Sequence, residues 1–305
     1  MDLLANIFEF KSFLLAALIF LPLEHLLPLH HDQKILRAGW LNDLTHAALT
    51  GLMVRTALLL EIVAIIALSD LLVPSAFKEL VAGQPLPLQV LELILLADLG
   101  FYAMHRLFHA VPSLWRFHAI HHSIEEMDWL AAHRVHPIDQ IMTKGASMIP
   151  CFALGFSTWT IIIFFAIYQW QSLLLHSNVK LNFGPLRWLV ASPEFHHWHH
   201  GKEHEAHDKN FAGQLPFWDV VFGTLHMPRG RGPIGFGITD PVPQTYVAQL
   251  LYPFRDSADT PAATDPPQVM DTPKLELAHH EATLVPQMDQ EPASRNMSEP
   301  AVVTS

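Results

Sequence analysis

Three short histidine-rich stretches decide how this chain folds: HRLFH at His105–His109, HAIHH at His118–His122 and HHWHH at His196–His200. In each stretch, called here the first, second and third box, histidines recur at spacings of three or four residues. Residues with that spacing are neighbours on one face of an α-helix, so their imidazoles stand side by side. The boxes therefore predict helical segments that present sets of nitrogen ligands to metal ions.

The number of histidines in the boxes indicates more than one metal ion. Eight neutral ligands are too many for one ion that keeps an open position, and they suit two ions with about four nitrogen donors each. Imidazole binds zinc, copper, iron and nickel, so the boxes alone leave the metal open. The alternatives are structural or solvated histidines, and a membrane protein for zinc or copper transport or storage. The eight candidate ligands are His105, His109, His118, His121, His122, His196, His199 and His200.

The composition of the chain points to a membrane. Of its 305 residues, 50% are hydrophobic and only 15% are charged, whereas a soluble domain carries about 25% charged residues. Cys151 is the only cysteine, which excludes an internal disulfide and a cysteine-rich zinc or iron–sulfur site. The chain has no basic stripe suited to nucleic acid, so we expect no nucleic-acid partner.

Four apolar regions predict the membrane-embedded part, at residues 13–29, about 47–73, 86–104 and about 145–175. A span needs ~20 apolar residues, so the first region is marginal and the next two are long enough. Pro150 and Gly155 interrupt the fourth region, which predicts a hairpin of two short helices. We therefore expect an all-α membrane bundle of about four to five embedded helices, with a helical cap that carries the boxes and binds two metals.

The distribution of Lys and Arg predicts the orientation of this bundle. These residues gather in the loop at 30–42 and around all three boxes, which places the boxes on the cytoplasmic side of a bacterial inner membrane or of the endoplasmic reticulum. The hairpin at 145–175 is required, because a single span there would put the third box across the membrane. We expect residues 1–255 to form the membrane domain, with the box region at about 90–226. Residues 256–305 have the composition of a disordered, acidic, Pro-rich tail.

The sequence around the boxes resembles the fatty acid hydroxylase / sterol desaturase superfamily of integral membrane non-haem di-iron oxygenases. The resemblance runs from about Asp98 to Thr224. One departure is Asn210-Phe211-Ala212, where the family usually has Asn-Phe-Gly. Besides the boxes, the segments that carry the resemblance are Asp98-Leu-Gly-Phe-Tyr102, Arg134-Val-His136-Pro137, His176-Ser177-Asn178, Ser192-Pro193, Leu215-Pro-Phe-Trp218-Asp219 and Phe222-Gly223-Thr224.

The resemblance implies a specific chemistry and a longer ligand list. It implies two iron ions, O2 as co-substrate, and hydroxylation or desaturation of a sterol or fatty-acyl-type lipid. It also implies an external electron donor, a ferredoxin or a cytochrome b5 with its reductase. His136 and His176 match two further histidines that are ligands in some members, whereas His197 falls between ligand positions. No catalytic group beyond the metal ligands is expected.

Ligating imidazoles need a partner on their other ring nitrogen, which fixes their tautomer and orientation. Asp98 precedes His105 by seven residues, about two helical turns, and so lies on nearly the same face. The candidates for this supporting role are Asp98, Asp128, Asp139, Asn178, Glu194, Asp208, Asn210 and Asp219.

Overall fold

The computed structural model describes residues 10–181 and 183–255, and within them all regular elements are helices, without any strand. Only two isolated β-bridges occur in this part of the chain, Pro28 with Val179 and Gly201 with Phe236. The predicted all-α class is confirmed. The predicted tail at 256–305 lies outside the described residues.

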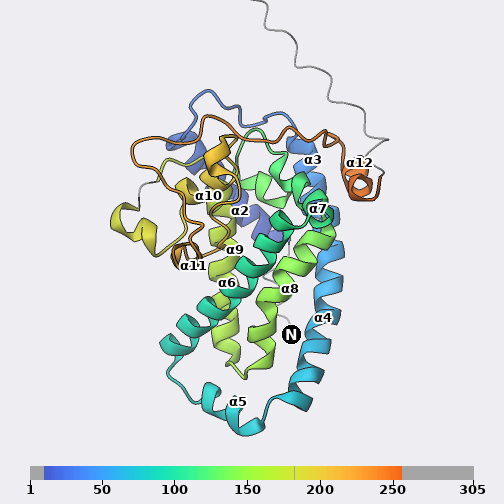
Figure 1. Cartoon of the computed structure of the whole chain (residues 1–305), viewed down its shortest axis with the longest axis vertical. Coiled ribbons are helices and arrows are strands. Elements are labelled where there is room, and N and C mark those ends of the chain that lie inside the picture. The colour runs from blue at the N-terminus through green and yellow to red at the C-terminus, as the bar shows by residue number, and fades with distance from the viewer. Residues whose placement is uncertain (1–9, 182, 256–305) are drawn as a thin grey trace, which may run out of the picture. The chain divides into compact units, whose positions relative to one another are not determined.

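Three helices are long and apolar enough to cross a membrane (Figure 1). The first is continuous over Trp40–Leu72 and consists of α3 (Trp40–Thr45), a π-helical turn and α4 (Gly51–Leu72). The other two are α6 (Leu86–Ala110) and α9 (Thr158–His176). Few residues of these helices are buried within the protein, and their exposed side chains include large apolar ones such as Leu60, Leu91 and Trp159. Such apolar surface is what a lipid bilayer requires.

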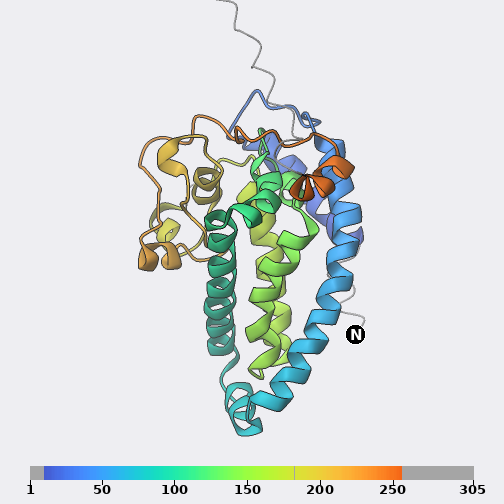
Figure 2. The same cartoon turned by 45° about the vertical axis from the view of Figure 1, so that its right-hand side comes forward.

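The predicted hairpin is present as α8 (Pro137–Ala153) and α9, but its helices are longer than expected: α8 begins before residue 145, and α9 is long enough to cross a membrane. Its turn contains Gly155 at φ +90°, a left-handed backbone angle that glycine adopts without a steric penalty. Helix α8 packs against both α4 and α6, and α9 packs against α6 (Figure 2). Pro150 lies inside α8 and does not end it.

The hairpin brings the third box to the same end of the bundle as the first two. Helix α5 (Ser75–Ala82) connects α4 to α6 at one end, and the box-bearing helices gather at the other end (Figure 2). Helix α7 (Pro112–His122) carries the second box, and α10 (Pro193–His199) begins the third. The remaining elements are α2 (Phe10–Leu26), α11 (Phe217–Phe222), α12 (Tyr246–Leu251), and the short turns η1 (His46–Thr50), η2 (Trp129–His133), η3 (Gly184–Trp188), η4 (His204–Ala206) and η5 (Tyr252–Phe254).

A buried ionic network ties the segment before α3 to this end of the bundle. Arg37 pairs with Asp43 at 2.5 Å and with Asp128 at 2.6 Å, and Arg134 pairs with Asp43 at 2.5 Å. Two cations and two anions balance one another here, and their side chains are almost completely buried. Paired and hydrogen-bonded charges avoid the large cost of an isolated buried ion.

Candidate metal centre

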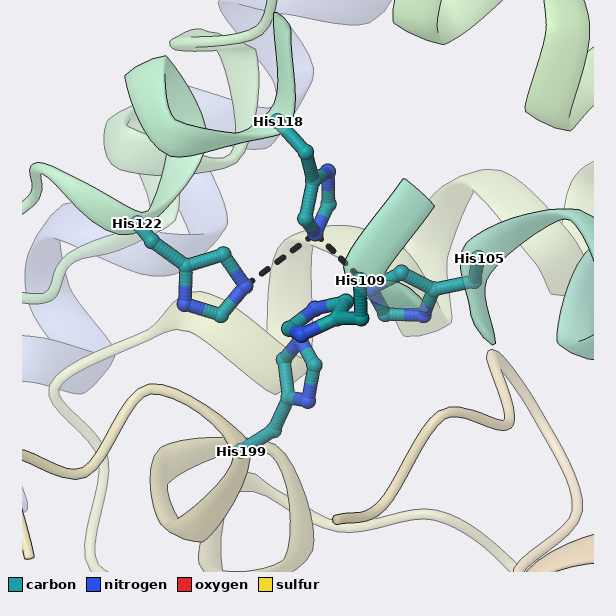
Figure 3. A group of neighbouring side chains, drawn as sticks. All are labelled: His105, His109, His118, His122 and His199. Carbon is teal, nitrogen blue, oxygen red and sulfur yellow. Dashed lines mark hydrogen bonds between the residues drawn. The ribbon is translucent and has the colours of Figure 1, made fainter. Parts of the chain in front are cut away.

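The histidines of the three boxes except His197, together with His176 at the end of α9, form two compact groups. Within each group, the candidate ligand nitrogens all lie within 4.8 Å of one another, as ligands of one ion must. Figure 3 shows the imidazoles of the first group converging from three elements on one point. The first group consists of His105, His109, His118, His122 and His199, and the second of His121, His176, His196 and His200.

Two of the boxes divide between the groups. In the second box, His118 and His122 are one helical turn apart and join the first group, whereas His121 joins the second. The third box divides in the same way, with His196 and His200 in the second group and His199 in the first. Each of these two helices therefore contributes to both groups, which lie against each other: the rings of His122 and His200 stack at 4.4 Å.

Hydrogen bonds on the far ring nitrogens fix the tautomers of the first group. His105 Nδ1 donates to the Phe211 carbonyl at 2.7 Å, and His199 Nδ1 donates to the Lys209 carbonyl at 2.7 Å. His118 Nδ1 lies 2.7 Å from Asp139 Oδ2. Because carbonyl oxygens only accept, the ring proton is on Nδ1, and Nε2 carries a lone pair.

The second group is arranged in the same way. His121 Nδ1 donates to the Arg134 carbonyl at 3.1 Å, and His176 Nδ1 donates to the Ser172 carbonyl at 2.8 Å. The Nε2 atoms of these two histidines therefore bear lone pairs, like those of the first group. Both groups present unprotonated nitrogens to their centres.

The close approach of these nitrogens fits a bound cation. The Nε2 atoms of His105 and His118 are 2.9 Å apart, and those of His121 and His176 are 3.1 Å apart. Two lone pairs cannot form a hydrogen bond, and they repel unless a cation lies between them. Nitrogens about 2.1 Å from one ion and at right angles to each other are about 3.0 Å apart. His109 Nε2 is also buried, without a hydrogen-bond partner among the described residues.

Burial keeps the box histidines outside the spans neutral. Desolvation, and repulsion between neighbouring imidazoles, lower the pKa of these side chains well below the usual value of histidine. Only a neutral imidazole has the lone pair that a metal needs. The histidines with this strongly lowered pKa are His118, His121, His122, His196, His199 and His200.

Two of the predicted carboxylates contact imidazoles directly. Asp139, at the start of α8, holds His118 as described above and is itself buried. Asp208 is exposed and lies 3.2 Å from His109 Nδ1, in a left-handed backbone conformation at φ 55°. The hydrogen bond from His109 lowers the pKa of Asp208. Both carboxylates can therefore orient a ligand of the first group.

Asp98 and Asp219 instead hold the loop that follows the third box. Asp98 accepts backbone N–H bonds from Gly213, Gln214 and Leu215 at 2.8 to 2.9 Å. Neither carboxylate contacts an imidazole, so our expectation for them is corrected: buried N–H groups of this turn must be satisfied, and the two carboxylates satisfy them.

Asp219 supports the ligand His105 indirectly, through the backbone at Phe211. It accepts the N–H groups of Phe211 and Ala212 at 2.8 and 2.9 Å, and so fixes the peptide whose carbonyl receives the His105 proton. Asn210, at φ 58°, exchanges hydrogen bonds with the backbone of His226 and donates to the Phe195 carbonyl. The Ala212 departure from the family pattern fits this turn, since Ala212 is buried without a positive φ.

Four other candidates lie away from both groups. Asp128 pairs with Arg37 and caps η2, where an N–H needs an acceptor. Asn178 is bonded to the backbone of His30. Glu194 pairs with Arg187 at 3.3 Å.

His136 is the fourth candidate that lies away from both histidine groups. It accepts from the Ile138 N–H as the N-cap of α8, while its Nε2 faces the Leu250 carbonyl at 3.2 Å, so both ring nitrogens already have partners. His197 likewise lies outside the groups, buried against Phe236.

Several groups that accept hydrogen bonds from the ligand imidazoles could not be identified from the sequence. The carbonyls of Phe211, Lys209 and Arg134 are backbone atoms, and any residue type could supply them. Ser172 is the exception, because it precedes His176 by one helical turn and its carbonyl lies on the same face.

The region that carries both groups is shared with known proteins. Residues 90–224 match the family model for fatty acid hydroxylase. This region of the chain is similar to the fatty acid hydroxylase family. All nine histidines of the two groups fall inside the matched residues.

Relatives within this superfamily are lipid hydroxylases and monooxygenases by name. The ornithine lipid hydroxylase OlsE of Rhizobium tropici is 35% identical over 170 residues, which cover 56% of this chain and 51% of that protein. The human alkylglycerol monooxygenase is 33% identical over 147 residues, covering 48% and 32%. A cholesterol 25-hydroxylase-like protein of Danio rerio is 28% identical over 134 residues, covering 44% and 53%. The chain thus spans about half or less of these relatives, and no solved structure matches it.

Proposed function

We propose that this chain is a membrane-bound lipid oxidoreductase that holds two iron ions and uses O2 to hydroxylate or desaturate a lipid. The observation that carries the proposal is the pair of histidine groups whose Nε2 lone pairs converge at 2.9 to 3.1 Å. Zinc has no redox chemistry, so the hydroxylase and monooxygenase relatives favour iron among the metals that bind imidazole.

The protein residues would position both the metals and the lipid. The first group would hold one ion with up to five nitrogens and the second group would hold the other with four, each buried away from bulk water. Bound iron would supply the activation of O2 and the removal of hydrogen from an unactivated C–H bond. The carbonyls of Phe211, Lys209 and Arg134 would keep the ligand tautomers fixed throughout.

A cavity beside the histidines would receive the lipid carbon. Its volume is about 100 Å³, and its wall includes His105 and His118 of the first group and His121, His176 and His196 of the second. Hydroxylation consumes one O2, two electrons and two protons, and it releases one water. We propose that a ferredoxin or a cytochrome b5 with its reductase supplies the electrons, on the cytoplasmic side where the boxes are expected.

The test combines metal analysis with lipid analysis. The full chain is expressed and purified in neutral detergent, and iron is counted per protein together with the lipid products of the producing cells. We expect about two iron ions in the wild type and an O2-dependent product. His121→Ala should lose iron from the second group and abolish the product. His204→Gln is the matched control, because His204 is exposed and lies in neither group.

The outcomes separate the proposal from metal transport. A protein that carries no iron, in cells whose lipids do not change, would overturn the oxidoreductase. Metal uptake into vesicles that depends on His121, without a lipid product, would instead establish transport. Iron together with a product that survives His121→Ala would refute the assigned ligands.

A further inference from the structure

Two neighbouring cavities that share part of their lining lie near the histidine groups. The cavity of about 100 Å³ lies against the histidines, and a second cavity of about 30 Å³ lies farther along α8 and α9. Lys144, Tyr168 and Gln169 line both cavities. The smaller cavity is otherwise mostly apolar, with Leu58 and Phe164 among its walls.

Lys144 is a cation that forms no direct ion pair in this wall. Its ammonium donates to the neutral Gln140 amide oxygen at 3.2 Å and pairs with no carboxylate among the described residues. The nearest acid along α8 is Asp139, which also lines the larger cavity and attracts Lys144 through its charge, but its carboxylate contacts His118 and not the ammonium. Glu61 of α4 lies against the neighbouring Gly145 but makes no ion pair with Lys144. A buried ammonium that lacks a directly paired carboxylate is costly, so a ligand that supplied this pairing would bind favourably.

We propose that Lys144 binds an anionic group of the lipid substrate, a carboxylate or a phosphate, and so fixes which carbon faces the metals. Gln140 and Gln169, which lie beside Lys144 in the wall of the larger cavity, offer amide hydrogens to the same oxygens. A lipid held in this way has the carbons next to its anionic group in the larger cavity, which the histidines also line. The proposal rests on the oxidoreductase proposed above and names the substrate class.

The position of Lys144 also sets the site of oxidation. Lys144 shares one cavity of about 100 Å³ with His118, His121 and His176. A lipid anchored there presents the carbons next to its anionic group to the histidines. The oxidised carbon is therefore close to the polar end of the lipid.

The experiment measures binding without turnover. Iron-loaded protein in neutral-detergent micelles is titrated calorimetrically under anaerobic conditions with dodecanoate, dodecyl phosphate and dodecanol, which share one chain length. We expect one or both anions to bind about tenfold to hundredfold more tightly than dodecanol. The tighter anion identifies the source of the charge, a carboxylate or a phosphate.

Variants assign the preference to one side chain. Lys144→Met should remove the preference for anions while the iron content stays unchanged, and Lys144→Arg should retain most of it. Lys34→Met is the matched control, since it removes an exposed charge from the same end of the protein. Equal binding of the three probes to the wild type, or a preference that survives Lys144→Met, would overturn the inference.

The two proposals can fail separately. O2-dependent lipid oxidation without a Lys144-dependent preference for anions would remove this inference and leave the enzyme. Anion binding that depends on Lys144, in a protein that oxidises no lipid, would remove the proposed enzyme and leave the binding site.

Discussion

His118 shows how a single ligand is held from both sides. Its Nδ1 faces Asp139, while its Nε2 is 2.9 Å from that of His105 and 3.1 Å from that of His122. A carboxylate on the far nitrogen fixes the ring and makes it a stronger base toward a metal. Asp139 is therefore the buried group whose loss should weaken the first group most directly.

We predict that Asp139→Asn lowers the affinity of the first group for iron about tenfold to hundredfold, because the neutral amide holds His118 less firmly. Affinity is measured by competition with a chelator, and folding is checked by the thermal unfolding of the variant. Asp70→Asn is the control, since Asp70 is exposed and pairs only with Lys78 at the far end. Unchanged iron affinity in Asp139→Asn would show that the carboxylate has no role in ligation.

At this scale the sequence predicts which histidines come together better than it predicts what supports them. Helical spacing makes His118 and His122 neighbours, but their separation from His121 into different groups depends on how α7 meets α6 and α9. Asp98 lies near the expected face, yet its partners are N–H groups more than one hundred residues away along the chain. A helical wheel contains no information about contacts of that range.

The crossing of α6 and α8 is the contact between elements on which the centre depends. Helix α6 carries His105 and His109, and α8 carries Asp139, so their separation sets the geometry of the first group. The helices approach at Gly100, where an added Cβ would lie 2.6 Å from the Ala146 carbonyl oxygen. Only glycine leaves room for backbone this close.

We predict that Gly100→Ala destabilises the protein by about 1–3 kcal/mol, because the methyl group forces the two helices apart. Unfolding by SDS in mixed micelles measures the change. Gly51→Ala is the matched control: it also replaces a helical glycine, but an added Cβ meets nothing within 4 Å, so alanine should be neutral or stabilising by up to about 1 kcal/mol. Equal effects of the two substitutions would remove the argument from close packing.

Among the elements, the hairpin was predictable and this crossing was not. Pro150, Gly155 and the need to place all three boxes on one side predict a hairpin at 145–175. The structure contains this hairpin, although α8 begins at Pro137 and α9 has the length of a membrane span. Nothing in the local pattern marks Gly100 as a contact, since the backbone it meets comes from another helix. Close approach between helices is a tertiary property that a single sequence does not display.

For the whole molecule, the central question is which side of the membrane holds the histidine groups. Both groups lie at the end of the bundle that is remote from α5 (Figure 2). Lys and Arg surround the boxes and the loop at 30–42, whereas the segment between α4 and α6 has only Lys78. The positive-inside tendency then predicts the histidines in the cytoplasm and α5 outside.

We predict that a cysteine at position 75 reacts with a membrane-impermeant maleimide added to intact bacterial cells and that a cysteine at position 34 does not. The variants are Ser75→Cys at the start of α5 and Lys34→Cys in the loop before α3, both exposed. Each is made in a Cys151→Ser background, so the native thiol, which is buried, contributes no label. Labelling is read from the mass of the purified protein.

A permeant maleimide is the control for this topology, because it should label both positions and so show that each thiol is reactive. Opening the cells should likewise expose position 34 to the impermeant reagent. Impermeant labelling of position 34 alone in intact cells would reverse the orientation and place the histidine groups outside. The donor that supplies two electrons for each O2 would then have to act outside the cytoplasm, so the labelling result also decides on which side that partner must be sought.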